Sequence, residues 1–566
     1  MDISSIRTTG ASANRIDIVF VAEGYTAEER DKFLADAKKA SEYILSKDNA
    51  RLNDPFATYS SLMNAKAVFV ASNQSGYSTD TETRDTAFGS KAYLSDGRLV
   101  YGDTGKVNQA LSGLSSDARD LVIVLINSDK YGGAGGSVAW ATAGNPLSYE
   151  VALHEIGHSF AGLQDEYIDT AIANNYPLSV LDNSAHVSTK SSPNEVPWKD
   201  WIGFTDELGT VGVYEGGYYR ATGVWRATET SKMLYLNDPF SAPEKEAFID
   251  RFYQYTANLV TPQRQTLLTK LAVTTPNNAL FDFTWKVDGN AVGGDAATLD
   301  LRSIILGRSD GAIDLSISLD VTDGTGLVRK ASVLADSTET ETFSMKLVKA
   351  TLDASSHAFV ATAPGNYFVD GSGDADSIVL KGRSGSLSWV EAGGGNDQVT
   401  GGLGSDQIYG NLGNDSLPGG GGIDRLFGND GIDNLSGGDG ADILTGGRGR
   451  DVLSGGAGND RFVFEDRDFG AKSKSGCDRI ADFTRGDKID LSAVDGDTRP
   501  GHAGDQAFAF IGTASFNTAD AQIGELRCTY EASTTYLYGD QNGDGVADFM
   551  LAITGTTVLA AGDFVL

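Results

Sequence analysis

The N-terminal part of the chain alternates short apolar runs with a longer amphipathic stretch. Apolar runs at residues 16–21, 67–71 and 121–126 predict β-strands, and the spacing of apolar residues over 27–45 predicts a helix. Strands and helices that alternate along a chain are typical of a mixed α/β domain. We therefore expect an α/β domain over residues 1–263.

The pattern changes after the last predicted helix of that domain, at residues 243–257. Residues 267–349 alternate apolar and polar positions between turns, most clearly at 281–287 and 313–321, and show no helical period. A period of two predicts strands with one buried face. The sequence therefore predicts a β-sandwich-like domain over residues 264–360.

From residue 392 to residue 463 the chain repeats every nine residues without an insertion. Eight nonapeptides follow the form Gly-Gly-x-Gly-x-Asp-x-apolar-x. Glycines permit tight turns, and the apolar residue of each repeat fills a narrow interior, which argues against low-complexity disorder. The repeats predict a parallel β-roll of the RTX type over residues 361–470, capped by residues 471–566. The apolar positions are Val399, Ile408, Leu417, Leu426, Leu435, Leu444, Leu453 and Phe462.

Each nonapeptide also carries one aspartate at a constant position. Successive turns would stack these carboxylates so that they face one cation, and Ca²⁺ prefers such oxygen ligands. Without calcium the carboxylates would repel one another, so folding and metal binding should be coupled. We predict calcium binding by Asp397, Asp406, Asp415, Asp424, Asp433, Asp442, Asp451 and Asp460.

The net charge and the cysteine content exclude several classes of binding partner and structural site. A formal net charge of -32 argues against nucleic acid or an anionic membrane, because both need clustered Lys and Arg. Cys477 and Cys528 are the only cysteines, which excludes a disulfide scaffold and a cysteine zinc site but leaves one optional disulfide open. No segment approaches the roughly 20 apolar residues that span a bilayer, and the N-terminus lacks a Sec-type signal. A soluble protein without membrane insertion is expected.

The strongest candidate for chemistry is a pair of histidines four residues apart. Asn145-Pro146 and Ser148 introduce a predicted helix that runs through His158. On that helix His154 and His158 lie on one face, so both imidazoles can reach one zinc ion. Glu155 can reach the water on that ion, which makes it the predicted catalytic residue.

A catalytic zinc needs a third protein ligand and one open position for water. Gly162 can end the helix just after His158, and Asp165 follows three residues later. Asp165 is therefore the predicted third ligand. The alternatives in the sequence are Glu166, Tyr167, Asp182 and His186.

The segment from His154 to Tyr167 resembles the signature of the immunoglobulin-A-type metallopeptidases, a metzincin-like family. The resemblance covers roughly residues 12–258. Within it, residues 17–29 look like the family's first strand and turn, and residues 216–233 look like a tyrosine-rich run that leads to a methionine turn at Met233. The resemblance implies a metzincin-like fold, hydrolysis of peptide bonds and a protein or peptide substrate, but not an immunoglobulin in particular.

The motif also departs from the commoner metzincin pattern. Where that pattern has a glycine and then a histidine, this chain has Ala161 and Gln164. The step from glycine to ligand is kept one residue later, which again leads to Asp165. Tyr218 or Tyr219 could donate a hydrogen bond to an oxyanion.

The segment after the repeats, residues 477–491, resembles the capping region of serralysin-type C-terminal domains. The chain ends with Asp563 before three apolar residues, as the type I secretion signals of those domains do. The resemblance implies export by type I secretion machinery and an extracellular location. A partial calcium loop is a further possibility at residues 540–548.

Taken together, these patterns predict a multidomain protein: an α/β metzincin-like zinc peptidase domain, a β-sandwich-like middle domain and a C-terminal parallel β-roll. The expected activity is that of a secreted zinc metalloendopeptidase. The alternative is a non-enzymatic calcium-binding surface or adhesive protein with an inert peptidase domain. Intact His154, Glu155 and His158 favour the enzyme.

Overall fold

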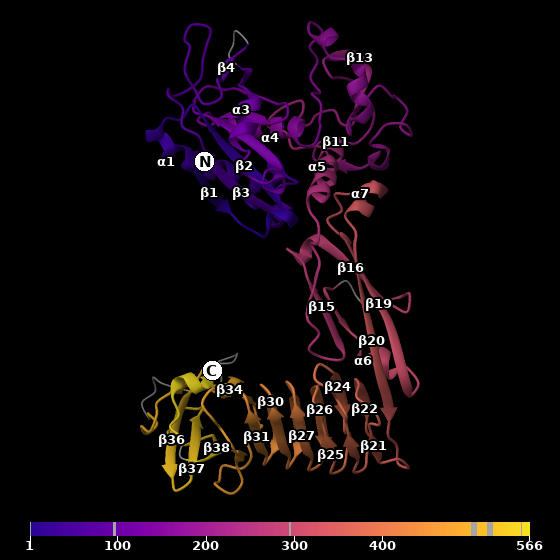
Figure 1. Ribbon diagram of the computed structural model, residues 1–566, viewed down its shortest axis with the longest axis vertical. Helices are drawn as coiled ribbons and strands as arrows, with labels where there is room; N and C mark the ends of the chain where they lie inside the picture. The colour runs from indigo at the N-terminus through magenta and orange to yellow at the C-terminus, as the bar shows by residue number, and fades with distance from the viewer. Residues whose placement is uncertain (1, 94–97, 294–295, 500–505, 518–523, 556) are drawn as a thin grey trace.

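The computed structural model describes residues 2–93, 98–293, 296–499, 506–517, 524–555 and 557–566. Figure 1 shows the N-terminal region and the repeat region at opposite ends of the molecule, joined by long strands of the middle region. The chain is therefore multidomain, as the sequence predicts.

A six-stranded mixed sheet forms the centre of the N-terminal region. The two edge strands are antiparallel to their neighbours, and the four inner strands are parallel. In sheet order the strands are β1 (Asp2–Arg7), β3 (Met63–Phe69), β2 (Ile16–Glu23), β6 (Leu121–Ile126), β8 (Ala139–Thr142) and β7 (Gly133–Ala134).

Both faces of this sheet are covered, which explains why β2 is apolar at consecutive positions. Ile18 and Phe20 belong to the core with helices α1 (Arg30–Leu45) and α4 (Ser148–Ser159), whereas Val19 and Val21 belong to the core with α3 (Thr104–Ala110). Parallel strands buried on both faces are typically continuous apolar runs. This packing places α4, which carries the histidine motif, against the sheet.

Strand β3 does not match the predicted strand at 67–71. It begins at Met63 and ends at Phe69. The first residues of β3 include the polar Asn64 and Lys66, which interrupt the apolar pattern. The Asn64 side chain accepts a hydrogen bond from the Thr9 amide (2.8 Å), and Lys66 forms a 2.7 Å ion pair with Asp17. Their partners come from other segments, so the local pattern could not reveal the strand.

The chain after α4 forms a smaller subregion around a long helix. Helix α5 (Ala242–Tyr255) begins with a capping box at Ser241 and Glu244 and packs Phe248 and Phe252 against Phe56. A small sheet in the order β12-β13-β9 lies in this part of the chain. The elements not yet named in the N-terminal region are α2 (Ala50–Asn53), β4 (Lys91–Ala92), β5 (Val100–Tyr101), β9 (Val187–Ser188), β10 (Thr205–Asp206), β11 (Gly209–Thr210), β12 (Tyr214–Gly217) and β13 (Arg220–Arg226).

The middle region is built from antiparallel strands, with two short helices that the alternation did not predict. Strand β16 (Phe281–Val287) buries every second residue, as a half-buried strand does. It pairs with β19 (Gly311–Asp323), which pairs with β20 (Glu339–Thr351). The remaining elements are β14 (Thr261–Pro262), β15 (Lys270–Thr274), β17 (Asn290–Val292), β18 (Thr298–Asp300), α6 (Arg302–Leu306) and α7 (Ala331–Asp336).

Buried polar contacts join the middle region to the N-terminal region. The hydroxyls of Tyr59 and Tyr253 both donate to the Asp323 carboxylate, the second at 2.6 Å. The Glu246 carboxylate on α5 accepts the backbone amides of Arg329 (2.6 Å) and Lys330 (2.7 Å). Hydrogen bonds to charged groups are among the stronger ones, so these contacts fasten α5 to the base of the β19–β20 hairpin.

The repeat region consists of two parallel sheets, consistent with a β-roll. One sheet contains β22, β24, β26, β28, β30 and β32, and the other contains β21, β23, β25, β27, β29, β31 and β33. Residues eighteen apart pair in register, such as Ile408 with Leu426, so one turn holds two nonapeptides. The apolar residue of all eight repeats is fully buried. The strands are β21 (Ala358–Val360), β22 (Tyr367–Asp370), β23 (Ser377–Val379), β24 (Leu387–Glu391), β25 (Gln398–Thr400), β26 (Ser405–Leu412), β27 (Ser416–Gly421), β28 (Arg425–Gly431), β29 (Asn434–Asp439), β30 (Ile443–Gly449), β31 (Val452–Ala457), β32 (Arg461–Glu465) and β33 (Asp478–Ile480).

The middle region and the repeat region share one sheet. Strand β20 pairs in parallel with β22, so a single twelve-stranded sheet runs from β17 to β39. At the far end the last strands close the roll: β38 pairs with β33, and the terminal β39 pairs with β34. These strands are β34 (Lys488–Ala493), β35 (Ala509–Phe510), β36 (Glu525–Glu531), β37 (Thr534–Asp540), β38 (Phe549–Thr554) and β39 (Phe564–Val565).

Among the helices that the structure describes, none is long and apolar enough to cross a membrane. Cys477 and Cys528 are both buried and unpaired. The optional disulfide is therefore not formed.

Candidate metal centre

Helix α4 presents His154 and His158 with their ring nitrogens facing each other. The two Nε2 atoms are 3.2 Å apart. His154 Nδ1 lies 3.1 Å from the Lys232 carbonyl oxygen, and His158 Nδ1 lies 2.8 Å from the Leu163 carbonyl oxygen. Because a carbonyl can only accept, both rings carry their proton on Nδ1. Both Nε2 atoms are left with a lone pair for a metal.

Asp165 completes this group because the chain turns back after α4. Gly162 has φ 68, a left-handed conformation that glycine adopts without strain, and the Leu163 amide donates to the Gly157 carbonyl at 2.9 Å. The turn brings Asp165 Oδ1 to 3.2 Å from His154 Nε2 and 3.3 Å from His158 Nε2. The structure thus brings together the three residues that the sequence nominated.

The donor set fits a tetrahedral metal ion. Ligand atoms about 2.0 Å from a tetrahedral zinc ion lie about 3.3 Å from one another, which is close to all three sides of this triangle. Asp165 Oδ1 is buried and has no hydrogen-bond partner among the residues that the structure describes. Three electron-pair donors held this close repel one another unless a cation lies between them.

The pKa shifts of Asp165 and His158 also indicate that the site favours positive charge. Burial alone would raise the pKa of Asp165, but the nearby His158 and His154 imidazoles, which become cations when they bind a second proton, hold it well below its usual range. Burial would lower the pKa of His158, yet Asp165 raises it to about 9. The group therefore attracts positive charge, as a cation site should.

Glu155 lies beside the three donors and outside their triangle. Its carboxylate is close to Gly135, where an added Cβ would lie 2.9 Å from Glu155 Oε2 and 2.8 Å from His158 Cβ. Burial raises the pKa of Glu155, and the two histidines oppose that rise. The β7–β8 connection passes so close to the motif that a side chain at residue 135 would displace His158 or Glu155.

Met233 lies under α4, where a methionine turn is expected. An added Cβ at Gly157 would lie 2.9 Å from the Met233 sulfur, and the Met233 carbonyl accepts the Glu166 amide at 3.0 Å. Met233 is fully buried. The segment that holds Met233 also supplies the Lys232 carbonyl that orients His154.

Glu166 and His186 belong to a separate buried cluster with Glu244. The Ser231 hydroxyl bridges the carboxylates of Glu166 and Glu244 at 2.8 Å each, and His186 Nε2 lies 2.9 Å from the Gln164 carbonyl oxygen. His186 therefore carries its proton on Nε2 and offers no lone pair there. This cluster ties the segment after the motif to Ser231 and to α5 rather than to the histidine pair.

The other two alternatives, Asp182 and Tyr167, differ in their relation to the triangle. Asp182 is in a short 3₁₀ segment, lines a different cavity and is exposed. Tyr167 is 39% exposed and packs edge-on against the Tyr219 ring at 5.1 Å. Asp182 is not grouped with His154 and His158 in the described part of the chain, whereas the Tyr167 side chain interacts with the Asp165 carboxyl.

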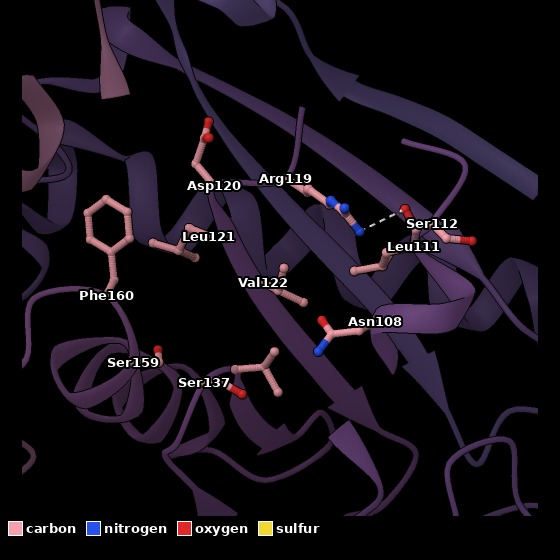
Figure 2. Close-up of a pocket in the computed structure, with 11 residues that line it drawn as sticks. Asn108, Leu111, Ser112, Arg119, Asp120, Leu121, Val122, Ser137, Ser159 and Phe160 are labelled. Carbon is pink, nitrogen blue, oxygen red and sulfur yellow. Dashed lines mark hydrogen bonds between the residues drawn. The ribbon is translucent and has the colours of Figure 1, made fainter. Parts of the chain in front are cut away.

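A cavity of about 330 Å³ lies at the end of α4. Figure 2 shows Ser159 and Phe160, which directly follow His158, across the cavity from Arg119. The Arg119 guanidinium donates to the Leu111 carbonyl at 3.2 Å, and burial raises the pKa of the nearby Asp120 to about 7. The lining includes none of the three candidate ligands, so this cavity is distinct from the metal centre.

The aspartates of the repeat region form two columns. The amide of each aspartate donates to Oδ1 of the aspartate one turn later, at 2.8 or 2.9 Å within the repeats. Each of the eight keeps one buried carboxylate oxygen without a hydrogen-bond partner among the described residues. These free oxygens are suited to calcium, which takes several oxygen ligands.

The columns extend beyond the eight predicted residues. The Asp376 amide donates to Asp397, and the amides of Asp451 and Asp460 donate to Asp478 and Asp487 at 2.9 Å. Asp376 precedes Asp397 by 21 residues, and Asp478 and Asp487 follow their neighbours by 27, so an eighteen-residue spacing misses all three. Pairing in space, rather than spacing in sequence, identifies the ends of each column.

Low pH should partly restore the repeat region in the absence of calcium. Burial raises the pKa of Asp397 to about 7, of Asp424 to about 8 and of Asp442 to about 6. Since unfolded aspartate has a pKa of about 3.9, the calcium-free fold binds more protons than the unfolded chain. The stabilisation that these protons give to the calcium-free fold is complete below about pH 4 and is lost as the pH rises through 6–8.

The measurement is far-UV circular dichroism of protein stripped of calcium, titrated from pH 8 to pH 4. The β-sheet signal should increase on acidification. In saturating calcium the trend should reverse, because protons compete with the ion for the carboxylates. A calcium-free signal that stays flat across this range would contradict the burial of the aspartates.

Comparison with known proteins identifies the class of each half. Residues 4–210 match the family model for IgA Peptidase M64, and residues 369–566 match that for Peptidase M10 serralysin C terminal. The matches suggest a metallopeptidase with an RTX-type C-terminal region. The two matches cover different parts of the chain and agree with the predicted fusion of a metallopeptidase domain with a serralysin-like C-terminal domain. The first match contains His154, Glu155, His158 and Asp165 and ends before Tyr219 and Met233.

Comparisons with curated proteins and with solved structures add little to the family matches. No curated protein matches the chain. Two solved structures are similar to part of it, both subunits of the mannuronan C5-epimerase of Azotobacter vinelandii. AlgE6R3 is 33% identical over 30% of this chain and 77% of its own, with a TM-score of 0.19. AlgE6R2 is 27% identical over 29% of this chain and 88% of its own, with a TM-score of 0.16.

Proposed function

We propose that this protein is a secreted zinc-dependent endopeptidase whose catalytic ion is held by His154, His158 and Asp165. The observation that carries the proposal is the triangle of two Nε2 atoms and Asp165 Oδ1, with sides of 3.2–3.3 Å. The match to IgA Peptidase M64 supports a metallopeptidase in general. Two neutral imidazoles and one carboxylate are ligands that zinc accepts in catalytic sites.

Glu155 is the proposed general base and acid of peptide hydrolysis. Zinc supplies Lewis acidity when bound, which acidifies a water molecule and polarises the scissile carbonyl. The Glu155 carboxylate accepts the proton of the attacking water and returns it to the leaving amine. Partial burial raises the pKa of the Glu155 carboxyl, which makes its carboxylate a better proton acceptor.

The repeat region is proposed to bind calcium and to fold outside the cell after type I secretion. Two facts support this: the match to the serralysin C terminal, a domain typical of secreted proteins, and the buried, unpaired aspartate oxygens. In a compartment poor in calcium these aspartates would disfavour folding, which keeps the chain exportable. Calcium outside the cell would then drive folding.

A direct test of the proposed function uses the purified full chain with calcium present. We expect about one zinc per chain and hydrolysis of casein that a zinc chelator stops and added zinc restores. A chain that binds zinc without any hydrolysis would favour the non-enzymatic alternative. A chain without zinc would contradict the metal centre itself.

The assignment of the third ligand gives a sharper test. Asp165→Ala should lose most bound zinc, because removal of a ligand is usually worse than the 10–100-fold loss that follows removal of a supporting group. Glu166→Ala is the matched control, since it removes the adjacent buried carboxylate, which faces Ser231. Full zinc in Asp165→Ala, with empty sites in Glu166→Ala or His186→Ala, would show that the ligand was wrongly chosen.

A further inference from the structure

The β12–β13 hairpin turns through two tyrosines in the left-handed conformation. Tyr218 has φ 47 and Tyr219 has φ 66, and the flanking Gly217 and Arg220 are paired. Two-residue hairpin loops with both φ values positive usually contain Asn and Gly, because a larger side chain is unfavourable there. Strained residues of this kind persist only where the surroundings hold them in place, and they gather at functional sites.

The strained turn is held against the segment that carries Asp165. The Tyr218 amide donates to the Asp165 carbonyl at 2.9 Å, and the Tyr219 amide donates to the Tyr167 carbonyl at 2.9 Å. The Asp169 amide donates to the Tyr219 carbonyl at 3.2 Å. The backbone of the turn therefore holds the chain at the candidate ligand and over the four residues that follow it.

The Tyr219 side chain then acts on the Asp165 carboxylate itself. Its hydroxyl donates a hydrogen bond to Asp165 Oδ2. The other oxygen, Oδ1, is the one without a hydrogen-bond partner that faces both histidines. The phenol thus occupies one oxygen of the carboxylate and leaves the other to point at the histidine pair.

Packing fixes the phenol in this position. Tyr219 is 5% exposed. The Tyr176 ring lies 4.1 Å from the Tyr219 ring at an interplanar angle of 32°, and the Tyr167 ring meets it edge-on. Arg220 donates to the carbonyls of Ala173 and Tyr176, which holds the Tyr176 segment in place. The hydroxyl has little freedom to leave Asp165.

We propose that Tyr219 is a positioning residue that orients Asp165 so that a single carboxylate oxygen, Oδ1, faces the zinc site. The inference rests on the proposed function, because it concerns the same metal centre. It also gives the strained turn a purpose, since the turn at Tyr218 and Tyr219 brings the phenol hydroxyl to Asp165 Oδ2. The Tyr219 hydroxyl then donates its hydrogen bond to Asp165 and is not the donor to an oxyanion.

The test is Tyr219→Phe, which removes the hydroxyl and keeps the ring and the turn. We expect the zinc dissociation constant of the full chain to rise about 10–100-fold, the range typical for loss of a hydrogen bond to a metal ligand. Affinity is measured by competition with a chromophoric chelator in saturating calcium. Tyr176→Phe is the matched control, because it removes the hydroxyl of the stacked ring and should leave zinc affinity unchanged.

A double-mutant cycle separates positioning from general damage. In an Asp165→Ala background Tyr219→Phe should weaken the remaining zinc affinity no further, because the carboxylate that its hydroxyl orients is gone. Equal weakening with and without Asp165 would overturn the proposal, and so would wild-type affinity in the single variant. The visible spectrum of the cobalt-substituted protein gives a second readout, since a carboxylate free to offer both oxygens changes the coordination number and the band intensities.

The two hypotheses fail in different ways. If the wild-type chain binds no zinc, the proposed metal centre fails. If the wild type binds zinc and Tyr219→Phe binds it equally well, only the role of Tyr219 fails. Unchanged circular dichroism in both tyrosine variants is expected, since neither substitution alters the ring packing.

Discussion

Replacing Glu155 with alanine is expected to remove nearly all peptide hydrolysis and to leave zinc bound. General acid–base catalysis contributes about 10²–10⁴-fold, so kcat/KM should fall by roughly that factor or more. The zinc content should stay at the wild-type level because Glu155 lies outside the triangle of His154, His158 and Asp165. Zinc content and hydrolysis of a casein substrate are measured on the same preparation.

Two further variants sharpen this prediction. Glu155→Gln keeps the size of the side chain and removes its basicity, so it should be as inactive as Glu155→Ala. Ser159→Ala, on the same helix and one residue after His158, should retain activity. An active Glu155→Ala protein would contradict the proposed mechanism, whereas loss of zinc in that variant would make Glu155 a ligand.

Removal of calcium is expected to unfold the repeat region. The buried carboxylates of the two columns lie without a positive partner for one oxygen each, and the many glycines favour the unfolded chain. Circular dichroism of the full chain in chelator should lose β-sheet signal and recover it cooperatively on addition of calcium at roughly micromolar to millimolar levels. Magnesium should not substitute, because it demands a smaller octahedral site.

A pair of charge-matched variants tests the columns directly. Asp424→Asn removes a carboxylate from the middle of a column and should raise the calcium concentration needed for folding. Asp430→Asn removes the same charge from an exposed position in the next repeat and should leave that concentration nearly unchanged. Equal shifts in both variants would show that total charge, and not the columns, controls folding.

The fragment chosen for such work should include β20. A segment from about residue 365 to residue 566 contains the repeats and should gain β-structure with calcium. A segment that begins before β19 also contains the strand on which β22 pairs, so it should fold at lower calcium. The shared sheet supplies a preformed edge, which lowers the cost of ordering the first turn.

The sequence by itself determined the features that depend on regular spacing. A four-residue step on a helix brings His154 and His158 to one face whatever lies around them. A nine-residue step, with one apolar residue and one aspartate in each repeat, specifies a narrow roll with a buried interior and stacked carboxylates. The alternation over residues 281–287 determined a half-buried strand in the same way.

Only the tertiary structure decided which oxygen-bearing side chain joins the histidine pair. The step from Gly162 favours Asp165 in the sequence, but Glu166 is adjacent and also buried, so the sequence left both open. The turn at Gly162 and the Tyr218–Tyr219 hairpin direct Asp165 to the histidines, whereas Ser231 holds Glu166 in the separate cluster with Glu244. Contacts between segments more than fifty residues apart settle the choice.

Contacts between distant segments also explain the other features that the sequence did not predict. The group that orients His154 is the backbone carbonyl of Lys232. Because every residue has such a carbonyl, the sequence does not predict this contact. Strand β3 begins at polar residues whose partners are remote, and the continuous sheet from β20 to β22 depends on pairing across a predicted boundary. Periodicity is a property of neighbours along the chain, whereas a ligand's direction and a sheet's continuity are properties of neighbours in space.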